Sequence, residues 1–399
     1  MKIIDSHVHI GKKEFCTNPN SDFLYNLCAD YDEIINLMNK NKIDKSIIFP
    51  IPHKDFDVKL SNEYVLEAYK KFPNRFIPFC RIDRNLDKNL SENGFKGVKL
   101  HLVYEDVDDS LLKKSLKIIE EYRVPIVIHA RFKDKVKQLV KIMSLAPTIK
   151  IILAHMGRGH IYTGDQVVEN ALELRKYPNL YMDTSTVGDI KSIINCCEII
   201  GYNRVVYGSD YPFGINIFAD YEYSSDISNL EQALSFENKQ KIFNQNIDAM
   251  LHNKKVSFDV QVRYSTVNDY EKIVDLIEQM SQRDVMYLAL RQKLALIRRI
   301  AKTGRHFIVA EYNHEIVGFL RESGRPDNFS LIEEVVVSPC CRNIGVCKKM
   351  LDFQHSIFKK TLAKTNKSNT VMNHIFEEYG YKLENPDAQR ILNWVRVVQ

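Results

Sequence analysis

The sequence predicts an α/β protein in which a (β/α)8 barrel, the TIM-barrel architecture, is followed by a smaller α+β domain. A chain of 399 residues is long for one core, and chains of this size usually divide into two domains. Short runs rich in Val and Ile recur through the first 250 or so residues, and the pattern then changes. We therefore place one domain at residues 1–254 and the other at 259–399.

The apolar runs of the first domain alternate with segments long enough to form helices. Such alternation is typical of parallel strands covered by helices, and eight units fit the length of a (β/α)8 barrel. Segments 31–39 and 111–122 carry apolar residues at helical spacing. The expected strands are residues 2–5, 45–49, 75–80, 97–100, 125–128, 150–154, 179–182 and 204–207.

The composition restricts the classes of function. The chain is 45% hydrophobic and 27% charged, contains no apolar run long enough to cross a bilayer, and opens on a strand-like segment instead of a signal sequence. Its eight cysteines form no Cys-x-x-Cys pair, which disfavours zinc knuckles and disulfide frameworks. The net charge of +5 is modest and dispersed. We expect a cytoplasmic protein that acts on a small molecule, with neither nucleic acid nor a membrane as partner, and leave the oligomeric state open.

The chain begins with the segment Asp5-Ser6-His7-Val8-His9. Side chains two apart on a strand project to the same face, so His7 and His9 can hold one metal ion between them, with Asp5 on that face too. In a chain with twelve histidines, one His-x-His pair by itself could equally be coincidence.

Polar side chains also stand where four later strands end, namely His101, His129, His155 and Asp210. The carboxyl ends of barrel strands form the face that carries the active site. Each of these residues alone is more often a core or surface residue than a ligand. Together with the first pair, they predict a metal site at the barrel mouth.

The segments that carry these residues resemble the amidohydrolase superfamily. The resemblance is closest to the amidohydrolase-related branch that also contains the aminocarboxymuconate semialdehyde decarboxylases, and it covers the whole first domain in the right order. It rests on Asp5-Ser6-His7-Val8-His9, Gly97-Val98-Lys99-Leu100-His101, Ile128-His129-Ala130, Leu153-Ala154-His155-Met156-Gly157, Asp183-Thr184-Ser185 and Gly208-Ser209-Asp210-Tyr211-Pro212-Phe213.

This resemblance implies a ligand set and a catalytic pair. It makes His7, His9, His129 and Asp210 the metal ligands and His155 either a catalytic imidazole or one that supports the ligands from behind. Imidazole and carboxylate suit Zn²⁺ or another divalent ion, and an incomplete shell leaves room for a water whose pKa falls to about 7. Asp210 would take the proton of that water, and His155 would orient or polarise the bond under attack.

The fourth strand supplies two further candidates, Lys99 and His101, which share a face by the period-two rule. In some relatives a lysine on this strand is carboxylated and bridges two metal ions, whereas one ion is commoner in this branch, so one or two ions remain open. We expect His101 to contact substrate and not metal. Arg131, with Arg158 and His160, could receive an anionic group or could equally be a solvated loop charge.

The barrel pattern breaks at residues 252–255, and strand-like alternation restarts at 260–264. We expect a helix with Asn268 as N-cap, a second helix at 285–302 that ends before Gly304, and a hairpin of 307–311 and 316–321 that turns at Asn313-His314.

A strand at residues 331–339 then runs through Arg342-Asn343-Ile344-Gly345 into a helix. A glycine-containing turn that opens a helix presents backbone N–H groups and the positive helix end to an anion, as pyrophosphate binding requires.

This turn resembles motif A of the GNAT acyltransferases, which cradles coenzyme A, and the segment from Asn369 through Met372 to 376–381 resembles that family's closing segment. The resemblance covers residues 259–399. It implies acetyl-CoA, or another acyl-CoA, bound at Val335, Val337, Arg342, Asn343, Gly345 and Asn369.

The second domain departs from the GNAT pattern at two positions. Cys347 stands where the family prefers Gly or Ala, and Phe376 stands where many relatives place the tyrosine that protonates the leaving thiolate, a role that Tyr379 could take. Glu333 or Glu334 could be the base for an amine, or equally a carboxylate exposed on a sheet.

The leading hypothesis is a bifunctional enzyme, in which a metal-dependent hydrolase of a C–N or C–O bond is joined to an acetyl-CoA-dependent N-acetyltransferase. One alternative keeps the metal site and replaces hydrolysis by non-oxidative decarboxylation of a small carboxylic acid. Another makes the second domain a catalytically inactive module that binds coenzyme A or regulates the barrel.

Overall fold

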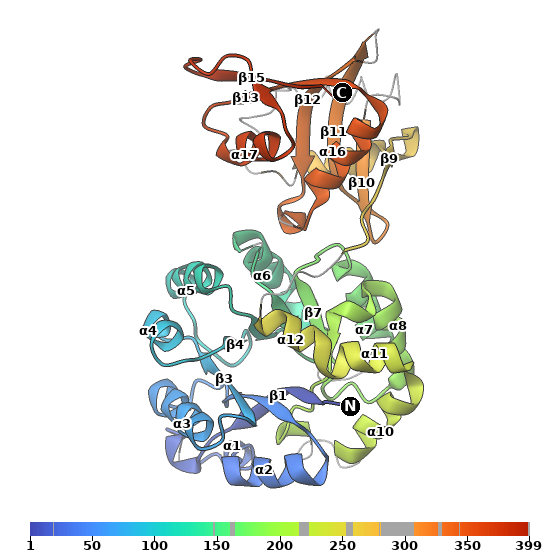
Figure 1. Ribbon diagram of the computed structural model, residues 1–399. Helices are drawn as coiled ribbons and strands as arrows, with labels where there is room; N and C mark the ends of the chain where they lie inside the picture. Colours follow the sequence, from blue (N-terminus) through green and yellow to red (C-terminus); the bar gives the residue numbers. More distant parts are fainter. Residues whose placement is uncertain are drawn as a thin grey trace. The chain divides into compact units, whose positions relative to one another are not determined.

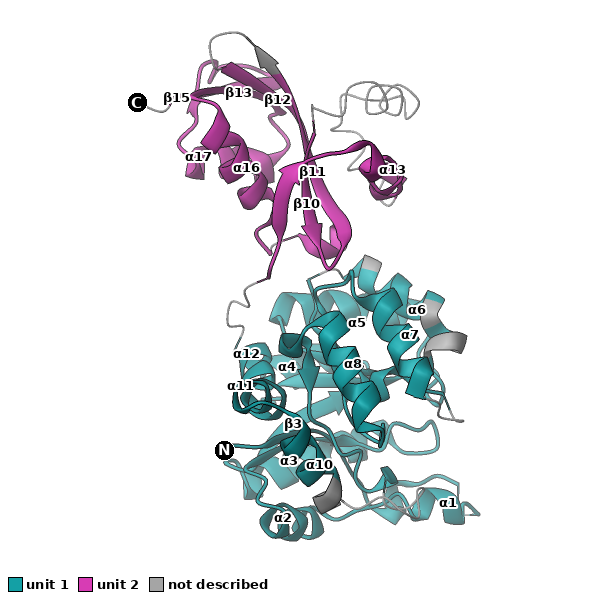
Figure 2. Cartoon of the chain, turned by 90° about the vertical axis from the view of Figure 1, so that its right-hand side faces the viewer, with its two compact units in different colours: residues 1–256 teal, residues 257–399 magenta. Residues whose placement is uncertain are grey.

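The chain forms two compact units, Met1–Val256 and Ser257–Gln399 (Figure 2). The predicted domain limits, residues 254 and 259, lie on either side of this division. The structure is a computed structural model that describes residues 1–18, 20–146, 148–159, 164–214, 223–252, 258–278, 280, 307–325, 329–342 and 344–397.

The first unit contains the predicted eight-stranded parallel barrel, with its strands in sequence order (Figure 1). Its strands are β1 (Ile4–Ile10), β2 (Lys45–Pro50), β3 (Phe76–Arg81), β4 (Gly97–His101), β5 (Ile126–His129), β6 (Ile151–Leu153), β7 (Leu180–Asp183) and β8 (Val205–Val206). The chain after β8 closes the barrel against β1, because Ser6 N–H donates to the Tyr207 carbonyl at 2.9 Å and His9 N–H to the Tyr211 carbonyl at 2.7 Å.

Every predicted strand of the barrel is present, and the largest difference is in β1. The strand was predicted at residues 2–5 from its apolar run, but β1 continues to Ile10, and all of its residues are buried. The reason is that His7 and His9 are polar in sequence, yet lie inside the barrel where other polar groups satisfy them.

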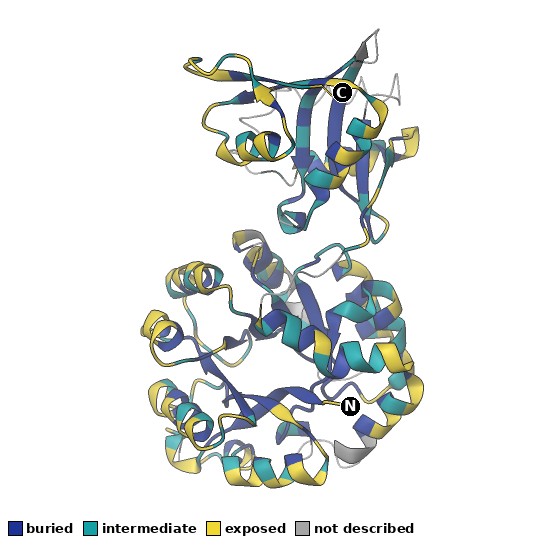
Figure 3. Ribbon diagram, viewed as in Figure 1, coloured by how far each residue is buried: buried dark blue, intermediate teal, exposed yellow. Residues whose placement is uncertain are grey.

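Amphipathic helices surround the barrel, with buried residues toward the strands and exposed residues outward (Figure 3). Aspartate side chains cap several of them, as Asp30 accepts from Asp32 N–H and Asp108 from Ser110 N–H. The described helices of this unit are α1 (Asp22–Tyr25), α2 (Tyr31–Lys40), α3 (Val58–Lys71), α4 (Leu86–Ser91), α5 (Asp109–Tyr122), α6 (Phe132–Leu145), α7 (Gly164–Leu174), α8 (Ile190–Ile200), α10 (Tyr223–Ala233), α11 (Phe236–Gln240) and α12 (Asn246–Leu251).

Apolar side chains fill the barrel interior below the histidines, including Phe49, Phe79 and Val127. Strand β4 passes so close to this layer that a Cβ at Gly97 would lie 2.3 Å from the Phe79 ring, so only glycine fits there. Because apolar side chains fill the interior, the polar side chains that could bind or react with a ligand lie at the mouth of the barrel. Within the described ranges, no helix is both long enough and apolar enough to cross a bilayer.

The second unit is a seven-stranded mixed sheet in the order β14-β15-β13-β12-β11-β10-β9. Helices α16 (Val346–Ile357) and α17 (Thr370–Glu378) pack on one face and α13 (Tyr270–Glu278) on the other (Figure 2). The strands are β9 (Gln261–Tyr264), β10 (Phe307–Tyr312), β11 (Glu315–Arg325), β12 (Phe329–Val337), β13 (Lys360–Asn366), β14 (Lys382–Leu383) and β15 (Ile391–Val397).

Of the elements predicted for this unit, the hairpin is present, but the first helix begins at a different N-cap. The hairpin is confirmed, and its turn residues Asn313 and His314 have φ of 47° and 65°, as a tight hairpin turn requires. The predicted N-cap Asn268 is wrong: Thr266 is the N-cap, because it forms a capping box with Asp269 and a 3₁₀ turn precedes α13. The predicted helix at 285–302 lies outside the described residues.

Candidate functional site

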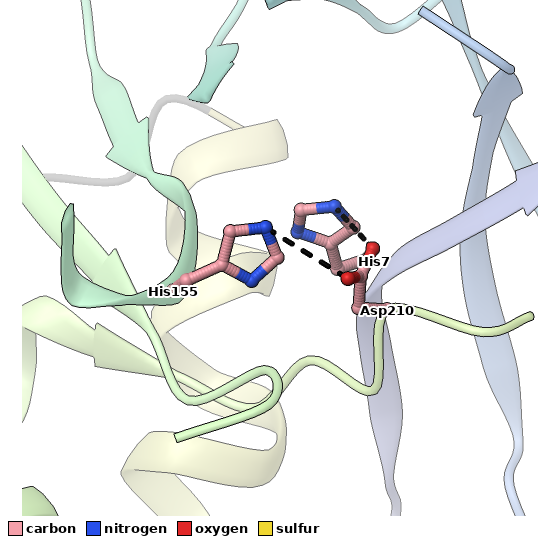
Figure 4. Close-up of side chains that lie close together, drawn as sticks. All are labelled: His7, His155 and Asp210. Atoms are coloured by element: carbon pink, nitrogen blue, oxygen red, sulfur yellow. Dashed lines mark ion pairs between the residues drawn. The ribbon is translucent and has the colours of Figure 1, made fainter. Parts of the chain in front are cut away.

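His7, His155 and Asp210 meet at the carboxyl ends of the barrel strands (Figure 4). One ligand atom from each lies within 4.8 Å of the others. His7 Nε2 is 3.2 Å from Asp210 Oδ1, and His155 Nε2 is 3.8 Å from Asp210 Oδ2. All three side chains are buried, so their polar atoms have little access to water.

The other predicted ligands, His9 and His129, join this cluster in different ways. His9 Nε2 lies 3.1 Å from Asp210 Oδ1, the oxygen that His7 also faces. His129 reaches the cluster through His155, whose Nε2 is 3.0 Å from His129 Nδ1. Three of the four predicted ligands therefore contact one another, and His155 separates the fourth from Asp210.

The backbone around the cluster is held in unusual conformations. His155 and Asp210 have φ of 56° and 60°, in the left-handed region that residues other than glycine rarely adopt. A Cβ at Gly208 would lie 2.9 Å from the Cβ of His7, so glycine allows the chain after β8 to approach β1. The Asp5 carboxylate accepts N–H groups of His7 and Ser209 and so ties these two segments together.

Asp183, at the end of β7, holds two of the histidines. Its Oδ2 is 2.7 Å from His7 Nδ1, and its Oδ1 accepts the backbone N–H of His155 at 2.8 Å. Asp183 belongs to one of the family-like segments, but no role was predicted for it from the sequence. Its position at the end of the seventh strand, like those of His101, His129 and His155 near the ends of theirs, was the signal that could have identified it.

The charges at this pair favour an ion pair. Burial alone would raise the pKa of Asp183, but the His7 imidazole outweighs it and lowers that pKa to about 2. Burial and Lys99 would lower the pKa of His7, but Asp183 and Asp210 raise it above its usual value. A carboxylate on Nδ1 orients an imidazole so that Nε2 is presented to the site.

The remaining histidines of the cluster are neutral. Burial lowers the pKa of both His9 and His155 to about 3. His155 Nδ1 is 2.8 Å from Ser185 Oγ and 3.1 Å from Thr186 Oγ1, which leaves Nε2 toward Asp210. Neutral imidazole is the form that binds metal ions.

Lys99 lies inside the cluster. Its Nζ is 3.1 Å from His7 Nε2 and 4.5 Å from the centroid of the Phe49 ring, and the residue is fully buried. Burial lowers the pKa of this ammonium group to about 8. The residue predicted to bind substrate is therefore in contact with a predicted metal ligand.

The other predicted substrate contacts form a wall of the mouth. His101 stacks on His129 with ring centroids 4.0 Å apart and on Tyr104 at 4.5 Å. Arg131 donates to the Tyr104 hydroxyl at 3.1 Å. Arg158 donates to Thr186 Oγ1 at 2.7 Å, and His160 lies outside the described residues.

A cavity of about 630 Å³ lies away from this cluster, at the amino ends of β1 and β2. Its lining includes Lys2, Asp44, Lys45 and Asp248 but none of the predicted ligands. The predicted metal ligands and substrate contacts therefore lie at the opposite end of the barrel from this cavity.

In the second unit, the sheet opens between β12 and β13. These parallel strands pair only through Phe329–Ile332 and Lys360–Ala363, although they continue to Val337 and Asn366. The register between β11 and β12 also shifts at Glu333, because Arg321 pairs with Glu334 and Glu322 pairs with Ile332. Such a bulge redirects a side chain and bends the strand.

Arg321 binds both candidate bases. Its Nε donates to Glu334 Oε2 at 2.8 Å, and its Nη1 pairs with Glu333 Oε2. The Glu334 side chain is 2% exposed and that of Glu333 is 26% exposed. Glu334 is therefore a buried ion-pair partner, and Glu333 is the more accessible carboxylate.

The remaining predicted residues for coenzyme A lie along and after β12. Val335 and Val337 are half-buried on the same side of the strand as Glu333, and Arg342 precedes the turn. Gly345, with φ of 91°, is the N-cap of α16, a conformation that favours glycine. Asn369 caps α17 by accepting the Met372 N–H at 3.3 Å. Asn343 lies outside the described residues.

Phe376 and Cys347, the two residues that depart from the GNAT pattern, both pack against the core of the second unit. Phe376 is buried among Tyr381 and Trp394. Burial raises the pKa of the Cys347 thiol to about 12, so this cysteine behaves as a small apolar residue in α16. Burial, together with Asp352, raises the pKa of Tyr379 as well.

Comparisons with known proteins agree with both units. The family described as amidohydrolase matches residues 4–252, and the acetyltransferase (GNAT) domain matches residues 303–383. No curated protein matches the chain.

Two solved structures share the barrel fold. A probable 2-pyrone-4,6-dicarboxylic acid hydrolase from Acinetobacter baumannii, with citric acid bound, is 18% identical with a TM-score of 0.52, covering 63% of this chain and 100% of its own. A putative hydrolase of the same acid from Pseudomonas putida is 19% identical with a TM-score of 0.51, covering 63% and 97%. The chain is an enzyme that belongs to the amidohydrolase family and carries a C-terminal GNAT domain.

Proposed function

We propose that the barrel is a metal-dependent hydrolase that cleaves a C–N or C–O bond of a small molecule. His7, His9, His129 and Asp210 would hold a divalent ion, and zinc suits this set of imidazole and carboxylate donors. The observation that carries the proposal is the convergence of His7 Nε2 and His9 Nε2 on one oxygen of Asp210, at 3.2 and 3.1 Å.

The donor set fits a cation. With its proton on Nδ1 toward Asp183, a neutral His7 would present the lone pair of Nε2 beside Asp210 Oδ1. In the metal-free protein, Asp183 and Asp210 raise the pKa of His7, so the protonated ring offsets their charge. A bound divalent cation would replace that proton. His9 Nδ1 is also buried without a hydrogen-bond partner among the described residues.

A bound divalent ion would act as a Lewis acid and lower the pKa of a nearby water to about 7. The chain's own residues then complete the chemistry. Burial would raise the pKa of Asp210, but His155 and His7 hold it well below the usual range, so Asp210 is ionised and can accept the proton of the attacking water. Neutral His155, fixed by Ser185 and Thr186, orients the bond under attack.

We propose that the substrate carries a carboxylate. Arg131 and Lys99 supply positive charge at and below the mouth, and a guanidinium can bind a carboxylate with two parallel hydrogen bonds. The two structural neighbours are named as hydrolases of a dicarboxylic acid, which supports this choice of substrate class.

The test uses the full-length protein and a panel of small amides, lactones and carboxylated acids. Chelation should remove metal and turnover together, and added Zn²⁺ or Mn²⁺ should restore both. Full activity in the metal-free protein would contradict the metal proposal. Release of CO₂ without cleavage of an amide or ester would contradict the hydrolase proposal and support the decarboxylase alternative.

For the second domain, we propose that acetyl-CoA binds where β12 and β13 part and that an amine is acetylated with Glu333 as base. The open sheet and the Gly345 turn support binding. Calorimetry with acetyl-CoA tests binding, and thiol release with a panel of amines tests transfer. Binding without thiol release would favour the regulatory alternative.

A further inference from the structure

The turn that follows β4 fixes the proton of one histidine at the mouth. His101 Nδ1 accepts the backbone N–H of Val103 at 3.2 Å and of Tyr104 at 3.0 Å. A ring nitrogen that accepts two N–H groups must carry a lone pair, so the proton of neutral His101 is on Nε2. The backbone thereby selects one tautomer.

The ring plane is fixed as well as the tautomer. His101 is stacked on His129 with an interplanar angle of 18° and on Tyr104 with an angle of 22°. The described part of the chain supplies no hydrogen-bond partner for Nε2, although the residue is only 4% exposed. Nε2 is not among the fully buried side-chain atoms that lack a partner, so its N–H can be reached by a ligand or a water that accepts from it.

A buried ion pair holds this turn in place. Glu105 accepts the backbone N–H of His101 at 2.7 Å and the Nε–H of Arg81 at 2.5 Å. Arg81, which is 2% exposed, also donates to the carbonyls of Ile51 and Phe56 at 3.2 Å. Burying such a pair costs desolvation energy and often adds no stability, so its effect here is to fix the geometry of the turn.

We propose that His101 is a fixed neutral hydrogen-bond donor that binds a carbonyl or carboxylate oxygen of the substrate through Nε2–H, with Glu105 and Arg81 as positioning residues. A neutral, preoriented donor stabilises negative charge on an oxygen without transferring a proton. Its part in catalysis rests on the proposed hydrolase function, but its tautomer does not.

The tautomer is measured by NMR on the full-length protein with ¹⁵N-labelled histidine at pH 7.5, where His101→Gln identifies the signals. We expect a protonated Nε2 and an unprotonated Nδ1. A proton on Nδ1, or on both nitrogens, would overturn the proposal whether or not hydrolysis is found.

The kinetic test compares three variants. His101→Ala should lower kcat/KM by about 10²- to 10³-fold, as loss of one preoriented donor does. His101→Gln should lower kcat/KM less than His101→Ala, because glutamine keeps a neutral N–H donor. His53→Gln is the matched control, because His53 also lies beside Tyr104, with ring centroids 5.5 Å apart. A loss under threefold in His101→Ala, or an equal loss in His53→Gln, would refute the role.

The positioning role is tested by a double-mutant cycle. Glu105→Gln should lower kcat/KM about tenfold, yet add no further loss to His101→Ala, because it acts through that ring. Additive losses would show an unrelated structural effect. If no hydrolysis is found, succinate is the probe: a shift of the His101 Nε2–H signal supports the donor, and an unchanged signal at saturating succinate contradicts it.

Discussion

The two candidate sites of this chain are built in different ways. The barrel site consists of side chains from β1, β4, β5 and β7 and from the segments after β6 and β8, and His9 contacts a residue 201 positions away. The second site is mainly backbone, formed by the parting of β12 from β13 and the turn at Gly345, within one stretch of chain. A side-chain site depends on the whole fold, whereas a backbone cradle depends on local conformation.

The sites also differ in how they bury charge. The barrel buries His9, His101 and His155 as neutral rings around two ionised carboxylates. The second unit buries one guanidinium between two glutamates. We therefore expect single substitutions to affect the barrel site more strongly, and the following predictions run from the largest effect to the smallest.

Asp210→Asn should abolish hydrolysis, with a loss of about 10³-fold or more in kcat, because it removes both a ligand and the base. Metal content by elemental analysis should fall with it, while acetyl-CoA affinity stays unchanged. His252→Gln, at the exposed histidine that follows α12 as its C-cap, is the control. Retained metal and activity in Asp210→Asn would refute the assigned site, and weakened acetyl-CoA binding would refute the independence of the two sites.

Asp183→Asn should weaken metal binding by about 10- to 100-fold, since loss of the carboxylate behind a ligating imidazole has that effect. The carboxylate holds His7 Nδ1 at 2.7 Å, and an amide cannot hold it by an ion pair. Metal titration with a competing chelator measures the change. An unchanged affinity would show that His7 is not oriented through Asp183.

Acid should unfold the metal-free barrel before the second unit. The folded-state pKa values of His9 and His155 are about 3 and that of His101 is about 2, all below the usual histidine value of 6.5. The unfolded chain therefore binds more protons as pH falls below about 6.5, and each ring contributes a loss of up to about 1.4 kcal/mol per pH unit. His7, whose pKa is raised, opposes this trend.

The second unit has fewer such groups, chiefly His355 with a pKa lowered by burial to about 4. Calorimetry between pH 7 and 4 should show two transitions, one of which moves to lower temperature more steeply. Hydrogen exchange assigns that transition to the barrel. Parallel movement of both transitions would contradict the difference in buried histidines.

Glu334→Gln should destabilise the second unit by about 1.5–3 kcal/mol, the range for a hydrogen bond to a charged group. Glu333→Gln should cost less than about 1 kcal/mol, because its side chain is 26% exposed and Glu334 is 2% exposed. Urea unfolding measures both, and the order should reverse for acetyl transfer if Glu333 is the base. Equal losses of stability would contradict the difference in burial.

Cys347→Ala should have the smallest effect, a change under about threefold in acetyl-CoA affinity. The thiol is packed within α16 and is close in size to the residues the family uses. Calorimetry of the variant measures the affinity. Tenfold tighter binding would show that Cys347 crowds the start of the helix.

The sequence by itself determined the fold and most candidate residues. All eight barrel strands were predictable because strand and helix periodicity are local properties. His7 and His9 were found by their spacing on one face of a strand, and His129, His155 and Asp210 because they stand where strands end. The Gly345 turn was equally readable, since its signal lies within a few residues.

Tertiary structure alone decided how these residues are used. That Asp183 holds His7, that His155 stands between His129 and Asp210, and that Arg81 and Glu105 fix His101 depend on contacts between distant strands. The bulge at Glu333 depends on pairing with β11. Protonation states and tautomers depend on burial and on partners in space, so they could not be predicted from the spacing of residues in the sequence.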